Sequence, residues 1–177
     1  MKTLVLTLAG IALVVSPCQA EDPLVWGEVS GGVRLGIGLG PATSQPTLRL
    51  VFQNTAAKNV QLPLGGVTPK GPLYNLVFRI TSPTGKEYSL FDLNGPTGRG
   101  LKIDPLVANL ARGQKYEILL LLNKLVYLDN NARSRPLPEM LAAHYSVRAT
   151  LDTSGDPREL RSFPLWFGNV SSGEFRQ

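Results

Sequence analysis

The sequence predicts an all-β protein, an antiparallel β-sandwich of about seven to nine strands with one short helical segment. Three observations indicate this class. Apolar and polar residues alternate along several stretches, which is the period of a half-buried strand. The 177 residues include 18 glycines and 14 prolines, and turn sequences separate the alternating stretches. No stretch beyond residue 20 keeps the 3.6-residue apolar period of a helix over three turns.

Four stretches alternate most clearly, and their apolar faces are expected to form the core between two sheets. The predicted inward residues are Leu48, Leu50 and Phe52; Leu76, Phe78 and Ile80; Tyr116, Ile118, Leu120 and Leu122; and Tyr145, Val147, Ala149 and Leu151. A shift of one residue in any stretch would turn its apolar set outward. The assignment therefore predicts register as well as strand position.

Turn chemistry and prolines mark the ends of these stretches. In residues 82–87, SPTGKE, Pro83 sets φ and Gly85 can take a positive φ, which predicts a tight turn. Loops are also expected at 94–100 and 153–157. Pro136 and Pro138 precede or open LPEMLAAH, the one predicted helix. The stretch LNKLVYLDNN fits either a strand extension or a helical turn.

Three alternate glycines in LGIGLG, residues 35–40, invite comparison with a phosphate-binding loop. Such a loop must open a helix, but PATSQP follows here. Alternation from Val33 through Leu39 instead predicts a strand with glycines on one face. That flat face would let a backbone or an overlying loop approach closely. The edge from Val33 to Gly40 is also a candidate for accepting a strand from a partner.

Residues 1–20 have the parts of a secretory signal peptide, so a periplasmic or secreted protein is predicted. Lys2 is the charged part, Leu4 to Val15 the apolar part, and Cys18-Gln19-Ala20 a small-x-small cleavage site. The apolar part is shorter than the roughly 20 residues of a membrane span. A lipoprotein acylated at Cys18 is an alternative that Pro17 disfavours, and a retained anchor is another.

Cleavage after Ala20 would leave residues 21–177 as a single domain. Cys18 is the only cysteine, so the mature domain would have no disulfide, thiolate nucleophile or cysteine metal site. Apolar packing must then stabilise it. No transmembrane span is expected after cleavage.

Candidate chemical groups are few, and no catalytic, cofactor-binding or metal-binding set is predicted. The only histidine, His144, precedes a predicted strand and is expected on the surface rather than in a Ser-His-Asp arrangement. Asp152, Ser154 and Asp156, with Glu159 beyond, resemble a calcium loop weakly, because the glycine and the final glutamate are misplaced. Trp26 and Trp166 are expected in the core or at a sheet edge.

Basic residues give the chain a formal net charge of +5 but form no run of five and are not interleaved with aromatic residues. Nucleic acid is therefore not an expected partner. The scattered residues are expected on the solvated surface: Arg99, Lys102, Arg112, Lys115, Arg133, Arg135, Arg158 and Arg161.

Three stretches resemble bacterial extracytoplasmic immunoglobulin-like domains, including the group similar to a small Bacillus-type proteinase inhibitor. They are LRLVFQNTAAKNVQLPL (48–64), ARGQKYEI (111–118) and HYSVRATLD (144–152). The chain lacks the cysteine pair of antibody domains, and His144 stands where a glycine usually precedes the tyrosine. The resemblance implies an immunoglobulin-like sandwich that binds or scaffolds, and it assigns no catalytic residues.

The sequence thus predicts an exported, non-enzymatic module acting on a protein or envelope partner. Two other hypotheses remain. A carboxylate-based glycan hydrolase requires two converging acids from among Asp92, Asp104, Asp129, Asp152 and Glu159. Binding of anionic glycan or lipid headgroups would use the arginines and weaken with salt.

Overall fold

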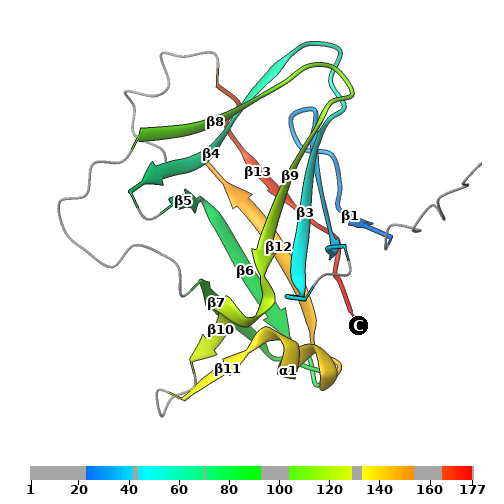
Figure 1. Cartoon of the computed structure of the whole chain (residues 1–177). Helices are drawn as coiled ribbons and strands as arrows, with labels where there is room; N and C mark the ends of the chain where they lie inside the picture. Colours follow the sequence, from blue (N-terminus) through cyan, green and yellow to red (C-terminus); the bar gives the residue numbers. More distant parts are fainter. Residues whose placement is uncertain are drawn as a thin grey trace, which may run out of the picture.

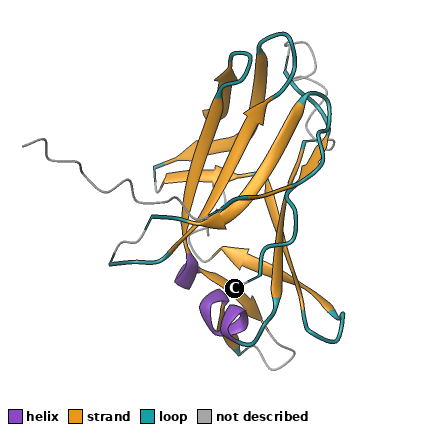
Figure 2. Cartoon of the chain, turned by 90° about the vertical axis from the view of Figure 1, so that its right-hand side faces the viewer, coloured by secondary structure: helices purple, strands orange, loops and turns teal. Residues whose placement is uncertain are grey.

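Antiparallel strands dominate the computed structural model of the chain, which confirms the predicted all-β sandwich (Figure 1). The structure describes residues 23–41, 44–69, 71–92, 104–128, 133–153 and 165–176. Residues 1–22, which contain the predicted signal peptide, lie outside these ranges. A view turned by 90° shows the helical segments gathered at the lower end of the strands (Figure 2).

Three sheets form the described part of the molecule. The four-stranded sheet contains, in spatial order, β1 (Val25–Trp26), β2 (Val33–Leu39), β3 (Thr47–Asn54) and β9 (Lys115–Leu121). The six-stranded sheet contains β11 (Ser134–Pro136), β10 (Leu125–Leu128), β7 (Glu87–Asp92), β6 (Leu76–Thr81), β12 (Ser146–Asp152) and β13 (Asn169–Ser171). The three-stranded sheet contains β5 (Gly71–Tyr74), β4 (Val60–Thr68) and β8 (Asp104–Leu110).

The described ranges thus hold thirteen strands rather than seven to nine. The difference arises because the chain changes sheet within stretches that look continuous in sequence. LNKLVYLDNN is one case: a 3-10 turn, η1 (Leu122–Lys124), leads from β9 into β10, so both alternatives for this stretch are realised. Short edge strands add the rest.

The core lies between the inner faces of the sheets, in the predicted register. Leu50 and Phe52 of β3 are fully buried, and so are Ile80 of β6 and Val147 of β12. Within the six-stranded sheet Ala149 pairs with Phe78 and Val147 with Ile80, while Leu50 pairs with Ile118 in the four-stranded sheet. Tyr145 is only partly buried and lies just before β12.

Two adjacent connections, from β3 to β4 and from β8 to β9, cross between sheets at Asn54. This side chain is fully buried. Its Nδ2 donates to the carbonyls of Lys58 and Leu110, at 2.8 and 2.9 Å, and its Oδ1 accepts from the amide of Ala56. Its own amide and carbonyl bond to the backbone of the neighbouring connection. Asn54 therefore holds both crossings with one set of hydrogen bonds.

The predicted helix is α1 (Leu137–Ala142), which follows Pro136 and carries Pro138 in its first turn. Its C-terminal end places His144 in the left-handed backbone conformation. His144 has φ 60°, and the amides of His144 and Tyr145 donate to the carbonyls of Leu141 and Met140. These bonds form a Schellman motif, whose left-handed position favours glycine. His144 occupies that position with a less suitable residue.

Strand β1 crosses β13 where both backbones carry glycine. A Cβ on Gly27 would overlap the carbonyl oxygen of Ser171, and one on Gly173 would lie 2.6 Å from the side chain of Val25. Here the pairing of β12 with the C-terminal segment also shifts by one residue, from Ser172 opposite Ala149 to Phe175 opposite Val147. The resulting bulge bends the C-terminal segment beside β1.

Candidate functional site

Strand β9 forms one margin of the four-stranded sheet, with β3 on its other side (Figure 1). It is seven residues long and reads KYEILLL. Among the described residues no strand pairs with its second side. A strand in this position leaves a row of backbone donors and acceptors available for pairing with another polypeptide.

The register with β3 identifies those backbone groups. The amide of Leu122 donates to Pro46, and the amide of Asn54 donates to Gln114. Between these bonds, every second residue of β9 directs its backbone N–H and C=O groups toward β3. These residues are Tyr116, Ile118 and Leu120. The backbone N–H and C=O groups of Lys115, Glu117, Leu119 and Leu121 therefore point away from β3. They are the groups that a further strand would engage.

The other edge strands of the described sheets carry features that discourage pairing. Strands β5, β8 and β11 contain Pro72, Pro105 and Pro136 respectively. Strand β1 has only two residues, and β13 has three and lies against the backbone of Gly27. Proline and short length are ordinary protections of sheet edges. Strand β9 has neither, which singles it out.

Side chains along the β9 edge change from charged to apolar. Lys115 is exposed, and Glu117 accepts a hydrogen bond from Arg49 of β3 at 2.9 Å. Leu119 occupies the next outer-face position of β9 and is 49% exposed, and Leu121 occupies the one after it. On the inner side, Tyr116 and Leu120 are partly buried against the core. The edge therefore offers one charged end and one apolar end.

Tyr116 also lies near Tyr74, at the end of β5. Burial, and secondarily the neighbouring Tyr116, raises the pKa of the Tyr74 hydroxyl above its usual range. A tyrosine hydroxyl is neutral at physiological pH even at its ordinary pKa, and this rise makes ionisation of Tyr74 still less favourable. The inner side of the β9 edge is accordingly uncharged at this point.

The outer face of the four-stranded sheet also carries the glycines of LGIGLG, on β2 next to the marginal strand β1, and the structural interpretation of that motif is confirmed. Trp26 pairs with Gly36 across β1 and β2, and a Cβ on Gly36 would lie 2.9 Å from the indole. The guanidinium of Arg34 stacks 4.3 Å from the indole centroid and bonds Gln53. The bare glycine face is covered from within the chain.

The prediction that Val33 to Gly40 forms an accepting edge is therefore wrong. Strand β2 pairs with β1 on one side and with β3 on the other. Glycines had suggested an open face, and the structure shows that they make room for Trp26. The open edge belongs to β9 of the same sheet, two strands away.

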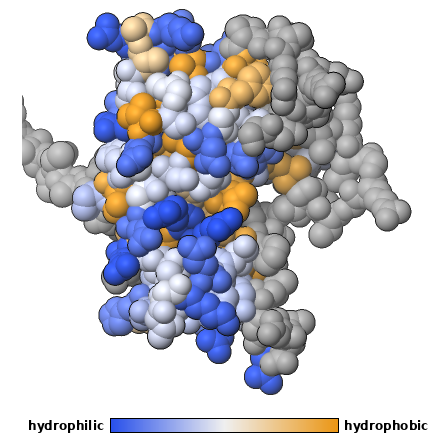
Figure 3. Space-filling view, turned by 180° about the vertical axis from the view of Figure 1, so that it is seen from behind, coloured by the Kyte–Doolittle hydropathy of each residue, from blue (hydrophilic) through white to orange (hydrophobic). Residues whose placement is uncertain are grey.

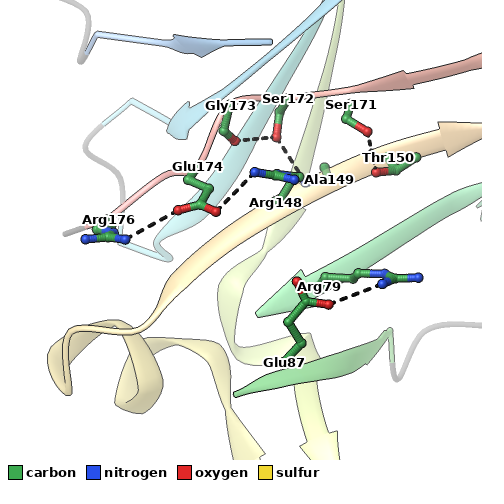
Figure 4. Close-up of polar contacts among 10 residues, drawn as sticks. All are labelled: Arg79, Glu87, Arg148, Ala149, Thr150, Ser171, Ser172, Gly173, Glu174 and Arg176. Carbon is green, nitrogen blue, oxygen red and sulfur yellow. Dashed lines mark hydrogen bonds and ion pairs between the residues drawn. The ribbon is translucent and has the colours of Figure 1, made fainter. Parts of the chain in front are cut away.

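The outer face of the six-stranded sheet is largely hydrophilic when the molecule is seen from behind (Figure 3). Arg79 of β6 and Arg148 of β12 lie directly opposite each other in the ladder. Each has a glutamate: Glu87 lies 3.3 Å from Arg79, and Glu174 lies 3.1 Å from Arg148. Glu174 also pairs with Arg176 (Figure 4). Opposed like charges need such partners.

Surface hollows lie beside this face and beside α1. One of about 760 Å³ separates Gly27–Ser30 from β13 and is also lined by Arg148. Another, of about 460 Å³, is lined by His144, Ser146 and Arg176, and a more apolar one of about 430 Å³ lies beside α1. His144 is exposed, as predicted. No described residue forms a hydrogen bond with its imidazole.

Of the acidic residues considered for hydrolysis, Asp92 and Asp152 lie on the two strands that flank β6 in the six-stranded sheet, whereas Asp104 lies on the three-stranded sheet. Asp104 begins β8 and Asp152 ends β12, while Asp92 ends β7. Outside the described residues lie Asp129, Ser154, Asp156 and Glu159, and with them most of the calcium-like stretch. Within the described ranges, no group of three or more His, Cys, Asp or Glu side chains is placed to hold a metal ion.

Both tryptophans lie where packing was expected. Trp166 is 8% exposed, and its indole N–H donates to the carbonyl of Gly31 at 3.2 Å. Four of the basic residues named from the sequence lie among the described residues, and all four are exposed: Arg112, Lys115, Arg133 and Arg135. The other four lie outside the described residues: Arg99, Lys102, Arg158 and Arg161.

Sequence reasoning missed two features of these surfaces. It treated KYEILLLL as a half-buried strand without asking whether it was an edge, although the absence of proline and the unbroken leucines were visible. It also passed over Arg79 and Arg148, whose juxtaposition depends on a pairing between strands about 70 residues apart.

Comparison of the chain with protein-family models, with curated proteins and with solved structures finds no match. No helix among the described residues is long and apolar enough to cross a membrane.

Proposed function

We propose that this protein is an exported, non-enzymatic binding module, which takes up an extended segment of a protein or envelope partner by strand addition at β9. The observation that carries the proposal is the β9 edge, with four residues whose backbone groups point away from β3. Main-chain hydrogen bonds supply affinity in this mode of recognition, and alternate side chains supply specificity. The signal-peptide pattern of residues 1–20 supports export.

An immunoglobulin-like topology and a single domain spanning residues 21–177 belong to the same proposal. The sandwich architecture and the resemblance of residues 48–64, 111–118 and 144–152 support it. In such a domain the two sheets serve as a rigid frame for an edge strand, so the binding function needs no catalytic group.

Photocrosslinking in the native envelope tests the proposal. A photoreactive amino acid replaces Leu119 in one variant and Val77 in another, because both are apolar strand residues of similar exposure, 49% and 46%. We expect one recurrent polypeptide adduct from position 119, identified by mass spectrometry, and none from position 77. Adducts of equal yield at both positions, or none at 119, would contradict strand addition at β9.

A second candidate function, binding of anionic glycan or lipid headgroups, is favoured by the opposed pair Arg79 and Arg148. An anionic group above them would compete with Glu87 and Glu174, which already pair with these two arginines. Retention on an anionic matrix should then fall steeply between low and physiological ionic strength. It should also fall in the variant Arg79→Gln/Arg148→Gln, and salt-independent retention would reject this function.

A further inference from the structure

The chemistry of the β9 edge specifies the partner in more detail. Every pair of named strands in the described sheets is antiparallel, so a strand added to β9 is expected to run antiparallel to it as well. In such a strand, the residues directly opposite Lys115, Glu117, Leu119 and Leu121 lie on the outer face of the sheet. The residues between them face inward, beside Tyr116, Ile118 and Leu120. Each position of the incoming segment therefore meets a known side chain of β9.

On the outer face of β9, the first side chain, Lys115, is a cation and the second, Glu117, is an anion. Lys115 is exposed and lies 6.0 Å from the Trp26 ring centroid, but no carboxylate among the described residues pairs with its ammonium group. Glu117 is already paired with Arg49 at 2.9 Å. An acidic residue is therefore favoured opposite Lys115, and a neutral or basic residue opposite Glu117. Leu119 and its neighbour Leu121 favour apolar residues.

A second copy of the same chain does not meet these requirements. If two copies paired antiparallel through β9, the residues opposite each other would have to be ones whose backbone groups point away from β3. Only certain registers meet this condition. Centring on Ile118 sets Lys115 opposite Leu121 and Glu117 opposite Leu119. Centring on Glu117 sets two glutamates together, and centring on Leu119 sets Glu117 opposite Leu121. Opposing Lys115 to Glu117 requires centring on Tyr116, which moves both leucines opposite the preceding turn.

We infer that β9 binds an extended, antiparallel peptide from a different protein, read from its amino end as four apolar residues, a basic or neutral residue, an apolar residue and an acidic residue. This inference rests on the proposed function and adds the partner's orientation and charge pattern. The final acidic residue lies opposite Lys115, and the first apolar residue lies opposite Leu121.

Two synthetic peptides test the pattern with the full chain after signal removal. One reads Val-Leu-Val-Val-Lys-Val-Glu between soluble flanks with a fluorophore, and the other ends in Lys instead of Glu. In low salt, fluorescence anisotropy should show the Glu peptide binding about tenfold more tightly. The variant Lys115→Glu should reverse the order, which a general change in peptide solubility would not do.

Orientation is read from a paramagnetic label at the peptide's amino end, which should broaden the amide signal of Leu121 more than that of Lys115. Equal affinity of both peptides for both forms of the protein, the opposite preference, or no binding of either peptide would overturn the inference. The proposed function is judged separately, since an adduct specific to position 119 would stand whichever peptide pattern failed.

Discussion

At the scale of single residues, one backbone conformation and one buried side chain affect the stability of the fold in opposite directions. His144 adopts the left-handed conformation that ends α1, and Asn54 is a polar side chain at full burial between two sheets. The first is a conformational penalty within the fold, since an L-residue other than glycine is strained there. The side chain of Asn54 stabilises the fold, because it makes three hydrogen bonds to the backbone.

Replacing His144 by glycine should stabilise the protein. Glycine accepts a φ of 60° without a Cβ penalty, and we expect a gain of about 0.5–1 kcal/mol after the added chain entropy of the unfolded state. Urea denaturation measures it. The control Ala143→Gly, at φ −93°, should lose a similar amount. A less stable His144→Gly protein would show that the imidazole makes a contact worth more than the strain.

Replacing Asn54 by alanine should destabilise the protein by about 2–4 kcal/mol. The carbonyl of Leu110 would lose this partner at a buried site and that of Lys58 at a part-buried one, while the amide of Ala56 would keep only its bond to the carbonyl of Gly32 at 3.2 Å. Thermal unfolding followed by circular dichroism provides the comparison. Asn109→Ala, at an exposed position of β8, should change stability by less than about 0.5 kcal/mol. Similar losses in both variants would contradict the role given to Asn54.

At the scale of elements, each strand presents one face to the core, and register decides which residues are buried. In β6, Phe78 is 4% exposed, whereas the side chain of its neighbour Arg79 is 64% exposed and pairs with Glu87. Exposed pairs of this kind contribute little to stability. The two adjacent residues therefore differ sharply in what their removal does.

Phe78→Ala should lose about 3–5 kcal/mol, the usual range for a buried phenylalanine. Arg79→Ala should lose well under 1 kcal/mol. Urea denaturation of both variants reports the register of β6, because a shift of one residue would exchange the two results. Equal losses, or a larger loss for Arg79→Ala, would contradict the strand assignment.

Local patterns were enough to predict strand faces, the helix opened by prolines and the strand through LGIGLG, because alternation and turn chemistry are short-range. Which strands lie side by side was not predictable in this way. The pairing of Arg79 with Arg148, the cover of Gly36 by Trp26 and the edge position of β9 all depend on distant segments. The open edge was therefore expected at β2, whereas in the described part of the chain it lies at β9 of the same sheet.

At the scale of the whole molecule, the sheets are joined by crossing connections rather than by a disulfide. Strand β1 and the C-terminal segment meet backbone to backbone, which only glycine allows at Gly27. This contact holds the ends of the described chain together across the two sheets. It also covers part of the β13 edge and leaves β9 as the available one.

Gly27→Ala should cost about 1–3 kcal/mol, because the new methyl group would meet the carbonyl of Ser171, which cannot rotate away as a side chain would. Glu28→Ala, next in sequence and exposed, should change stability by less than about 0.5 kcal/mol. Differential scanning calorimetry compares the two. Unchanged stability in Gly27→Ala would show that β1 and β13 can separate freely.

Amide hydrogen exchange along β9, followed by NMR, tests most directly the central claim that this edge is open to a partner. The amides of Ile118 and Leu120 face β3 and should be protected by on the order of a hundredfold or more relative to those of Glu117 and Leu119, which point away from it. Equal protection of all four amides would show that another part of the chain already covers the edge, and it would contradict the account.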